Sequence, residues 1–461
     1  MTADEIVVRS PYDGAEVGRV PKGTADDVDR AVAAAGAALQ NDPLPPWRRA
    51  EILDAAARLL AGREDEFART IALESAKPMK TARVEAQRAV STFTFAAVEA
   101  RRLTGEMVPI DATAIGEGRL AFTLRLPIGV VGAISPFNFP LNLVAHKLAP
   151  AIAAGCPVVL KPASQTPLTA LALADLLVND AGLPADYLHV VTGSGGEVGE
   201  ALVRHPDVVY LTFTGSGEVG WAIKERAGRK KVALELGNNS PLIIEADGDW
   251  EAAAEAVART GFAHAGQSCV SVQRVIVHAE VADGFTKALA ALVGKLVVGD
   301  PLDEATDVSA LISTDDRDRV VAWIDEAVAA GARLVTGGAV GDDGILRPTV
   351  LADVTPDMRV CREEVFGPVV AVQAYPSTDE GLRLADDTRY GLQAGIYTSS
   401  LATALRAARE LHFGTVLVNE VPTWRADQMP YGGVRSSGNT KEGPAAAVRE
   451  MTEERLVVIK A

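Results

Sequence analysis

Apolar residues recur at helical spacing through the N-terminal part of the chain. After residue 25 they return every three or four positions, which is the period that places side chains on one face of a helix. Glycine and proline separate the apolar runs. The pattern predicts helices over 25–39, 47–75 and 86–103. We therefore expect amphipathic helices that pack against a core in this part of the chain.

The pattern changes beyond residue 118. Apolar and polar residues alternate over 121–126, which predicts a β-strand, and Pro127 after it favours an edge strand or a turn. Strand-like runs then alternate with helical runs. The strand-like runs are 129–135, 157–161, 187–193, 208–215 and 231–237, and the helical runs are 140–155, 168–182, 195–205 and 216–227. This alternation predicts a mainly parallel sheet with helices on both faces, which binds ligands at the carboxyl ends of its strands.

A second α/β region follows from about residue 250. Its patterned segments are 249–262, 274–278, 281–296, 317–338 and 365–375, and the last apolar run, 455–460, could add a strand. A chain of 461 residues is too long for one ordinary hydrophobic core. Pattern and length together indicate an α/β protein of two or three domains.

Composition excludes several classes of protein. Hydrophobic residues make up 48% of the chain, which argues against disorder. The formal charge is −16, from 45 basic and 61 acidic residues, and it argues against general binding to nucleic acid or to a membrane surface. The uncharged stretch 126–146 contains three prolines and is a poor membrane-spanning helix. A few local donors could still bind an anionic small molecule.

The cysteines indicate a reduced protein. They are Cys156, Cys269 and Cys361, which are odd in number, widely spaced and without a C-x-x-C pair. A disulfide framework, a zinc cluster or another metal site is therefore not expected. The N-terminal residues are charged and contain no apolar signal core, so we expect a cytoplasmic protein.

Residues suited to chemistry follow several of the predicted strands. In a parallel sheet such positions meet at one edge. They are Asn138, Lys161, Gly215, Ser216 and Glu235. Cys269 lies farther along, in GFAHAGQSC, among small and polar residues. That setting is typical of a reactive thiol rather than of a buried structural one.

Six stretches, in this order, resemble motifs of the NAD(P)-dependent aldehyde dehydrogenase superfamily. They are SPFNFP, LKPASQTP, FTGSGEVG, LELGNNSP, GQSC and EEVFGPV. The separation of Glu235 and Cys269 fits as well, and the resemblance covers essentially the whole chain. It is strongest to the branch with lactaldehyde-type and related small polar aldehyde dehydrogenases.

The resemblance implies a particular α/β architecture and assembly. A Rossmann-type coenzyme domain would take 1–107 and 128–237, and an α/β catalytic domain would take 238–430. A small β oligomerisation element would join 108–127 to the C-terminal return, 431–461. Homodimers or homotetramers are usual in the superfamily, and we expect one of them here.

The resemblance also assigns catalytic roles. Cys269 would attack the aldehyde as a thiolate, because the resulting alkoxide gives up hydride far more readily than the aldehyde does. The side-chain amide of Asn138 and the backbone N–H of Cys269 would stabilise that alkoxide. Glu235 would then act as the general base for hydrolysis of the thioester. His264 precedes Cys269, but the resemblance argues against a cysteine–histidine dyad.

NAD or NADP is the implied coenzyme. The residues that match its binding positions are Phe137, Lys161, Ser164, Gly215, Ser216, Glu364 and Phe366. Lys161 would bind the adenine ribose, Ser216 the pyrophosphate and Glu364 the nicotinamide ribose. Ser164 stands where many NAD-preferring relatives have glutamate, so we expect NADP to be accepted as well as NAD. GSGEVG spells G-x-G-x-x-G, but we interpret this match as partly accidental.

The resemblance also implies a class of substrate. We expect a lactaldehyde-like or other short polar aldehyde, with a succinate-semialdehyde, sulfo-aldehyde or phosphono-aldehyde as the alternative. Ser268 stands where enzymes for a phosphorylated aldehyde usually have arginine. Arg425, in PTWRADQMPYGG, could bind a distal carboxylate, sulfonate or phosphonate, or it could be a solvated arginine.

Simpler roles remain for two of the site residues, and other activities remain for the chain. Asn138 could cap a helix and Lys161 could be a surface charge. A coenzyme A-dependent enzyme and a catalytically silent binding relative are the other hypotheses. Glu235 favours hydrolysis by water over transfer to coenzyme A.

Overall fold

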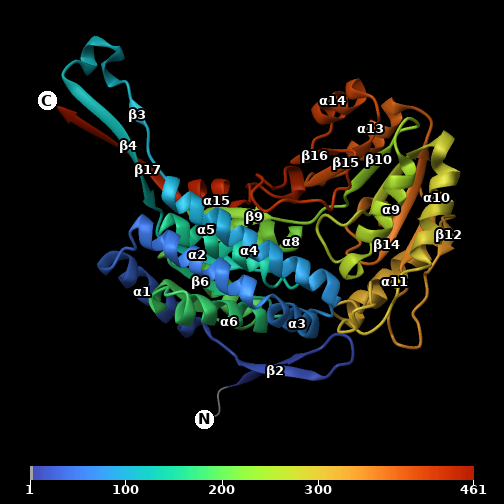
Figure 1. The fold of residues 1–461 in the computed structure, drawn as a ribbon, viewed down its shortest axis with the longest axis horizontal. Helices are drawn as coiled ribbons and strands as arrows, with labels where there is room; N and C mark the ends of the chain where they lie inside the picture. Colours follow the sequence, from blue (N-terminus) through green and yellow to red (C-terminus); the bar gives the residue numbers. More distant parts are fainter. Residues whose placement is uncertain (1–3, 461) are drawn as a thin grey trace.

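The computed structural model describes residues 4–460. Within that range the chain forms two large parallel sheets that lie side by side, a sheet that projects as an arm, and an N-terminal hairpin (Figure 1). The predicted α/β fold class, with a Rossmann-like parallel sheet and an additional sheet domain, is confirmed. The exact domain boundaries given above stay a prediction.

The first large sheet has five strands, all parallel to their neighbours. They are β5 (Val130–Ile134), β6 (Val158–Lys161), β7 (Leu188–Val190), β8 (Val208–Thr214) and β9 (Lys231–Glu235). The order across the sheet is β7-β6-β5-β8-β9. The chain therefore reverses its direction of winding between β5 and β8, and ligands bind at the carboxyl edge of such a switch point.

Helices cover both faces of this sheet (Figure 1). They are α1 (Ala25–Asn41), α2 (Pro46–Gly62), α3 (Glu64–Ser75), α4 (Met79–Arg102), α5 (Asn142–Ala154), α6 (Leu168–Asp175), α7 (Glu200–Arg204) and α8 (Gly217–Arg226). The pattern predicted one helical run over 47–75, but Arg63 takes φ −125° and ψ 20°, which separates α2 from α3. Buried Glu85 of α4 accepts hydrogen bonds from the backbone N–H groups of Leu141 and Asn142, at the start of α5.

The second large sheet has seven strands in the order β12-β13-β14-β11-β10-β15-β16. They are β10 (Pro241–Ile244), β11 (Arg274–His278), β12 (Arg333–Thr336), β13 (Thr349–Ala352), β14 (Val369–Tyr375), β15 (Gln393–Tyr397) and β16 (Thr415–Val418). All neighbours are parallel except β12 and β13. The sequence pattern did not single out β10, β13, β15 or β16.

The helices of this second region flank its sheet. They are α9 (Trp250–Thr260), α10 (Ala279–Val293), α11 (Thr314–Ala329), α12 (Arg359–Arg362), α13 (Thr378–Asp386) and α14 (Leu401–Glu410). Two further strands form the N-terminal hairpin, β1 (Glu5–Arg9) and β2 (Glu16–Pro21), which the sequence pattern did not indicate. Between residues 4 and 460, no helix combines the length and apolar character needed to cross a membrane.

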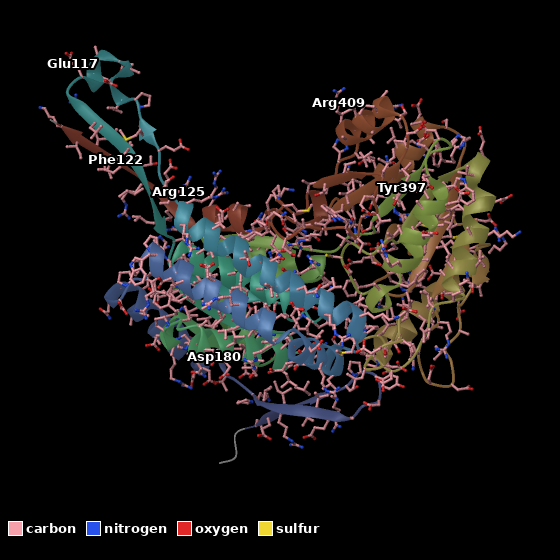
Figure 2. All side chains as sticks on the ribbon, viewed as in Figure 1. Glu117, Phe122, Arg125, Asp180, Tyr397 and Arg409 are labelled. Carbon is pink, nitrogen blue, oxygen red and sulfur yellow. The ribbon has the colours of Figure 1, made fainter. Side chains whose placement is uncertain are left out.

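The arm is an antiparallel sheet of β3 (Met107–Val108), β4 (Arg119–Pro127) and β17 (Thr452–Lys460), and β17 follows α15 (Pro444–Glu450). The strand expected near the C-terminus is therefore present. The strand expected over 121–126 is present as β4, and Pro127 is its last residue, in the part of β4 that pairs with β17 alone. Figure 2 shows Phe122 and Arg125 on this arm, away from the body of the molecule.

Candidate active site

A cavity of about 430 Å³ lies at the carboxyl ends of β5, β8 and β9. Segments far apart in the sequence meet there, as the switch point of the sheet predicts. Of the residues predicted from the sequence, its lining contains Phe137, Asn138, Gly215, Ser216, Glu235, Cys269, Glu364 and Phe366. Lys161, Ser164 and Arg425 do not line this cavity.

The loop before Cys269 has an unusual backbone. His264, Ala265 and Gly266 take φ values of 49°, 53° and 71°, in the left-handed region that L-residues rarely adopt in series. A Cβ atom at Gly266 would lie 2.0 Å from the carbonyl oxygen of Gly367, so only glycine allows the two loops to pack. This close approach explains the glycine of GQSC, and the glycine of EEVFGPV is required separately, since a Cβ atom at Gly367 would lie 2.7 Å from the side chain of Val320.

Cys269 is half-buried and faces the cavity. Its Sγ lies 3.1 Å from the hydroxyl of Tyr431. Burial raises the pKa of the Cys269 thiol to about 12, and the hydrogen bond to Tyr431 acts in the opposite direction. The hydrogen-bond partner that the structure gives this sulfur is therefore a tyrosine, and not His264, which is buried nearby.

Asn138 follows β5 and is buried at the cavity wall. Its Nδ2 donates a hydrogen bond to the carbonyl oxygen of Gln267, at 2.9 Å. An amide nitrogen carries two hydrogens, so a second one is left to donate into the cavity. The alternative that Asn138 caps the following helix is wrong, because the first N–H groups of α5 are held by Glu85.

Glu235 ends β9, and its carboxyl group is buried beside the cavity. Among the residues that the structure describes, neither of its side-chain oxygens has a hydrogen-bond partner. Burial, and then the charge of Glu442, raise the pKa of Glu235 well above its usual range. A Cβ atom at Gly432 would lie 2.7 Å from Oε1 of Glu235, so a bare backbone covers this carboxyl group. Such a carboxylate is a stronger base than one in water.

The first turn of α8 lies beside the cavity, with Ser216 directly before the helix. Backbone N–H groups at a helix N-terminus favour a phosphate group. Close packing requires two of the glycines here, since a Cβ atom would lie 2.6 Å from the ring of Phe213 at Gly215 and 2.3 Å from Leu236 at Gly220. At Gly217 the nearest atom is 3.7 Å away, so that glycine of the GSGEVG match is not sterically required.

Glu364 lies opposite, on the loop before β14. Its Oε1 accepts a hydrogen bond from the backbone N–H of Asn238 at 3.0 Å, and a Cβ atom at Gly237 would lie 2.2 Å from its Oε2. Burial raises the pKa of Glu364 to about 7. Phe366 takes φ 49° and meets Phe137 edge to face, with ring centroids 5.9 Å apart. The side chain of Asn238 is buried, and its Nδ2 donates to the hydroxyl of Ser240 and to the carbonyl of Gln393.

Lys161 and Ser164 lie at and beyond the end of β6, next to β5 in the sheet. Lys161 is 5% exposed, so the alternative of a surface charge is wrong. Its Nζ donates to the carbonyl of Pro162 at 2.8 Å, and burial lowers its pKa to about 8. The hydroxyl of Ser164 donates to the carbonyl of Gly193 at 2.8 Å. The Lys161 ammonium has two further hydrogens to donate, and the Ser164 oxygen can still accept a hydrogen bond. Together with the α8 N-terminus, these groups fit a dinucleotide laid across the strand ends.

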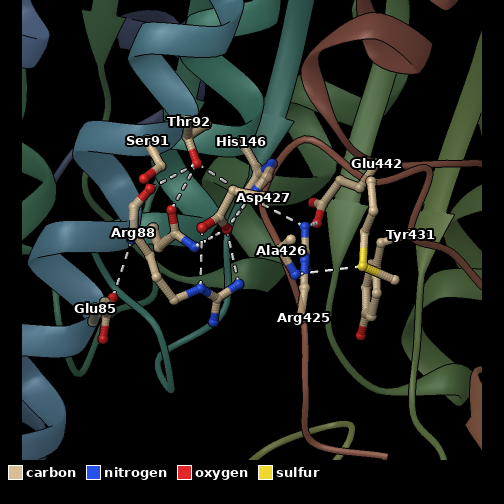
Figure 3. A network of polar contacts seen from close by, with 12 residues as sticks. Glu85, Arg88, Ser91, Thr92, His146, Arg425, Ala426, Asp427, Tyr431 and Glu442 are labelled. Atoms are coloured by element: carbon tan, nitrogen blue, oxygen red, sulfur yellow. Dashed lines mark hydrogen bonds and ion pairs between the residues drawn. The ribbon is translucent and has the colours of Figure 1, made fainter. Parts of the chain in front are cut away.

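Arg425 is the residue whose surroundings differ most from the expectation. Its side chain is 5% exposed, so it is not a solvated arginine. One Nη donates to Oε2 of Glu442 at 2.9 Å and lies 3.1 Å from a ring nitrogen of His146. The guanidinium carbon lies 3.8 Å from the centroid of the Tyr431 ring (Figure 3). Sequence analysis missed Tyr431 and Glu442, since nothing in the local pattern links them to Cys269.

The geometry of the cavity indicates a class of enzyme. A cysteine, an amide and an unpaired carboxyl group share one cavity with a helix N-terminus at the edge of a doubly wound sheet. This arrangement suits nucleophilic addition to a carbonyl beside a bound dinucleotide. Residues 1–457 match the model of the aldehyde dehydrogenase family, and the chain belongs to that family. The family predicted from the sequence motifs is confirmed, and the chain is an NAD(P)-dependent enzyme.

Two curated relatives and one solved structure illustrate the similarity. A 3-sulfolactaldehyde dehydrogenase of Priestia aryabhattai is 47% identical over 458 residues, which cover 99% of this chain and 95% of the relative. A lactaldehyde dehydrogenase of Methanococcus vannielii is 40% identical over 419 residues, which cover 90% and 88%. The glyceraldehyde-3-phosphate dehydrogenase of Methanocaldococcus jannaschii, solved with NADP, has a TM-score of 0.95 and 36% identity, and the match covers 100% of both chains.

Proposed function

We propose that this enzyme oxidises a short 2-hydroxy aldehyde, such as lactaldehyde or its 3-sulfonated form, to the carboxylic acid. The observation that carries the proposal is that Cys269, Asn138 and Glu235 line one cavity. The names of the relatives support the class of substrate. The sulfonated aldehyde was an alternative in the sequence analysis, and the 47% identity to a 3-sulfolactaldehyde dehydrogenase now favours it. Succinate semialdehyde and a phosphono-aldehyde remain the second candidates.

The first step is addition of the Cys269 sulfur to the aldehyde carbon. The C–S bond forms, the carbonyl π bond breaks, and its electrons become an alkoxide. The remaining amide hydrogen of Asn138 and the backbone N–H of Cys269 donate to that oxygen. The loss of one such donor typically costs about 2.7–4 kcal/mol of transition-state stabilisation. The helix N-terminus, Lys161, Ser164 and Glu364 would hold NAD(P), which would accept the hydride that leaves as the C–H bond breaks and the carbonyl re-forms as a thioester on Cys269.

The second step is hydrolysis of the thioester on Cys269. Glu235 removes a proton from water as the water attacks the acyl carbon, and the thiolate of Cys269 leaves. The raised pKa of the buried Glu235 makes its carboxylate a stronger base than a solvated one. This carboxyl group favours water over coenzyme A as the acceptor of the acyl group.

A panel of aldehydes tests the proposed substrate class. Initial rates of coenzyme reduction are measured with lactaldehyde, 3-sulfolactaldehyde, succinate semialdehyde, propanal and a long-chain aldehyde, each with NAD and with NADP. We expect the highest kcat/KM for one of the two 2-hydroxy aldehydes. A preference for propanal or for the long-chain aldehyde would contradict the proposal.

Arg425 is the proposed source of positive charge for an anionic group on the substrate. Arg425 does not line the cavity and its charge is paired with Glu442, so it can act on an anionic substrate only through space, from behind Tyr431. We therefore expect Arg425→Met to raise KM for 3-sulfolactaldehyde only about a few-fold more than KM for lactaldehyde, which is neutral. Equal changes for the two aldehydes would remove Arg425 from substrate recognition.

Ser164 is the proposed determinant of coenzyme choice. A glutamate there would repel the 2′-phosphate of NADP, since two like charges about 4 Å apart cost roughly 1 kcal/mol in water and about 4 kcal/mol at an effective dielectric of about 20. We therefore expect Ser164→Glu to lower kcat/KM for NADP by about tenfold or more and to leave NAD within a few-fold. Parallel kinetics with both coenzymes measure this. An unchanged ratio, or wild-type enzyme inactive with NADP, would contradict it.

We also propose a cytoplasmic homodimer or homotetramer assembled through the arm. One face of β4 and β17 presents apolar side chains that the chain itself leaves exposed, with Leu120 49%, Leu124 41% and Ile459 48% exposed. A second copy of the chain would bury them. The unpaired thiols are in keeping with a reducing compartment. Sedimentation equilibrium gives the number of chains, and a monomer at micromolar concentration would contradict the assembly.

A further inference from the structure

The hydroxyl group of Tyr431 lies against the reacting atom of the enzyme. Its oxygen is 3.1 Å from Sγ of Cys269, and the residue is 2% exposed. The Tyr431 ring is held in a small apolar cluster with Val270 and Leu392, against which Cys269 packs. Since the ring is packed on all sides, its hydroxyl is directed at the sulfur and has little freedom to turn elsewhere.

A buried cation covers the face of the same ring. The guanidinium carbon of Arg425 lies 3.8 Å from the ring centroid, well inside the range of a cation–π contact (Figure 3). Glu442 holds Arg425 at 2.9 Å, and the backbone N–H of Tyr431 donates to the carbonyl of Glu442 at 3.1 Å. Tyr431, Arg425 and Glu442 therefore form one rigid unit.

A second contact fixes the cation from the other side. His146 lies 3.1 Å from Arg425 and 3.0 Å from Asp427, which also binds Arg88 of α4 (Figure 3). Burial lowers the pKa of His146, and the charge of Arg425 acts in the same direction, so the ring is neutral and adds no positive charge beside Arg425. The network keeps Arg425 on the ring of Tyr431.

The charges around Cys269 differ in their effect on its ionisation. Burial raises the pKa of the thiol to about 12, and Glu364 and Glu235 act in the same direction. The hydrogen bond from Tyr431 and the charge of Arg425 oppose them. A cation over the ring also draws electron density from the phenol, which makes its O–H a better donor. Both contributions favour a thiolate over a thiol.

We propose that Tyr431 is a catalytic residue that donates a hydrogen bond to the ionised sulfur of Cys269, and that Arg425 is a positioning residue that strengthens this donor through the ring. No proton passes between the two side chains. The hydrogen bond stabilises the thiolate until the aldehyde binds. The inference rests on the proposed function only in taking Cys269 as the nucleophile.

The experiment measures the reactivity of the thiol without any aldehyde. Iodoacetamide alkylates Cys269 across a range of pH, and mass spectrometry follows each cysteine separately, with buried Cys156 and Cys361 as internal references. Tyr431→Phe removes one oxygen atom and retains the ring. Loss of a hydrogen bond to a charged group typically raises the pKa of that group by about one to two units, and we expect this rise for the thiol of Cys269. At a fixed pH below that pKa, alkylation should fall by about 10–100-fold.

A matched control is Tyr187→Phe, which removes the hydroxyl of another buried tyrosine. That hydroxyl accepts from the N–H of Leu44 and donates to the carbonyl of Asp42, far from Cys269 in the chain. The control should leave the alkylation profile of Cys269 unchanged. An unchanged or faster profile in Tyr431→Phe, or an equal shift in the control, would overturn the role of Tyr431.

Two substitutions of Arg425 test its part. Arg425→Met should move the Cys269 profile to higher pH, and Arg425→Lys, which retains a cation, should restore part of the shift. A Met variant with a wild-type thiol profile would overturn the role of Arg425. If Arg425→Met does not fold, Arg425→Lys and Tyr431→Phe still decide between the outcomes. Because no aldehyde is present, a wrong substrate assignment would leave these results intact.

Discussion

Cys269→Ala will lower the rate of aldehyde oxidation by on the order of 10⁴-fold or more, because without the sulfur no covalent adduct can form and the aldehyde itself is a poor hydride donor. The residue lies in the cavity with Asn138 and Glu235, so alanine leaves the coenzyme site and its donors in place. Coenzyme reduction is followed by absorbance, and coenzyme binding is measured separately by titration of protein fluorescence.

The control for this loss is Cys361→Ala. Cys361 is buried in the core of the seven-stranded sheet region and does not line the cavity. It should retain most of the wild-type turnover, with any loss reflecting stability. If Cys269→Ala retained more than a few per cent of wild-type turnover while binding coenzyme normally, Cys269 would not be the nucleophile.

Glu235→Gln will separate the two halves of the reaction. The first turnover should still produce about one reduced coenzyme per active site in a rapid burst, because hydride leaves before Glu235 acts. Steady turnover should then fall by about 10²–10⁴-fold, the usual effect of losing a general base. Stopped-flow absorbance measures the burst, and hydroxylamine traps the thioester that accumulates on Cys269.

The pH dependence gives a second readout of the same residue. A general base is inactive when protonated, so hydrolysis should rise with pH through the pKa of Glu235. That pKa lies well above the usual range because of burial and the nearby Glu442. Glu235→Gln should abolish this rise. Near wild-type steady turnover in the Gln variant, with the pH dependence retained, would contradict the role.

Glu74→Gln is the matched control for Glu235. Glu74 is also buried with its pKa raised, to about 7, but it accepts hydrogen bonds from the N–H groups of Leu168 and Thr169 at the start of α6. Its loss should change stability and leave the ratio of burst to steady turnover as in the wild type. A stalled burst in this control would mean that the stall does not report on the thioester.

Local sequence determined the parts of the site that depend on short motifs. Asn138 and Glu235 lie at or just beyond the carboxyl end of a strand, where a run of apolar residues stops and a loop begins, whereas Glu364 lies before β14 and was found only through the motif EEVFGPV. Hydrophobic alternation predicts such ends, and parallel topology brings them to one edge. Two glycines of the short motifs GQSC and ELGN are also needed for local reasons. Gly266 is required by the close approach of another backbone, and Gly237 by the close approach of a side chain. The family, the fold class and the type of enzyme followed from these motifs and are confirmed.

The surroundings of these residues were decided by tertiary packing. Whether Glu235 is a strong base depends on burial and on Glu442, which lies far along the chain and meets it only in the folded protein. The sequence alone left open whether Arg425 is solvated or contacts other groups. In the folded protein its guanidinium lies over the ring of Tyr431. The same is true of Asn138, which is free to face the cavity because Glu85 of α4 holds the start of α5. Sequence patterns report local periodicity and composition, whereas burial, pairing and charge at a site are set by segments that become neighbours only on folding.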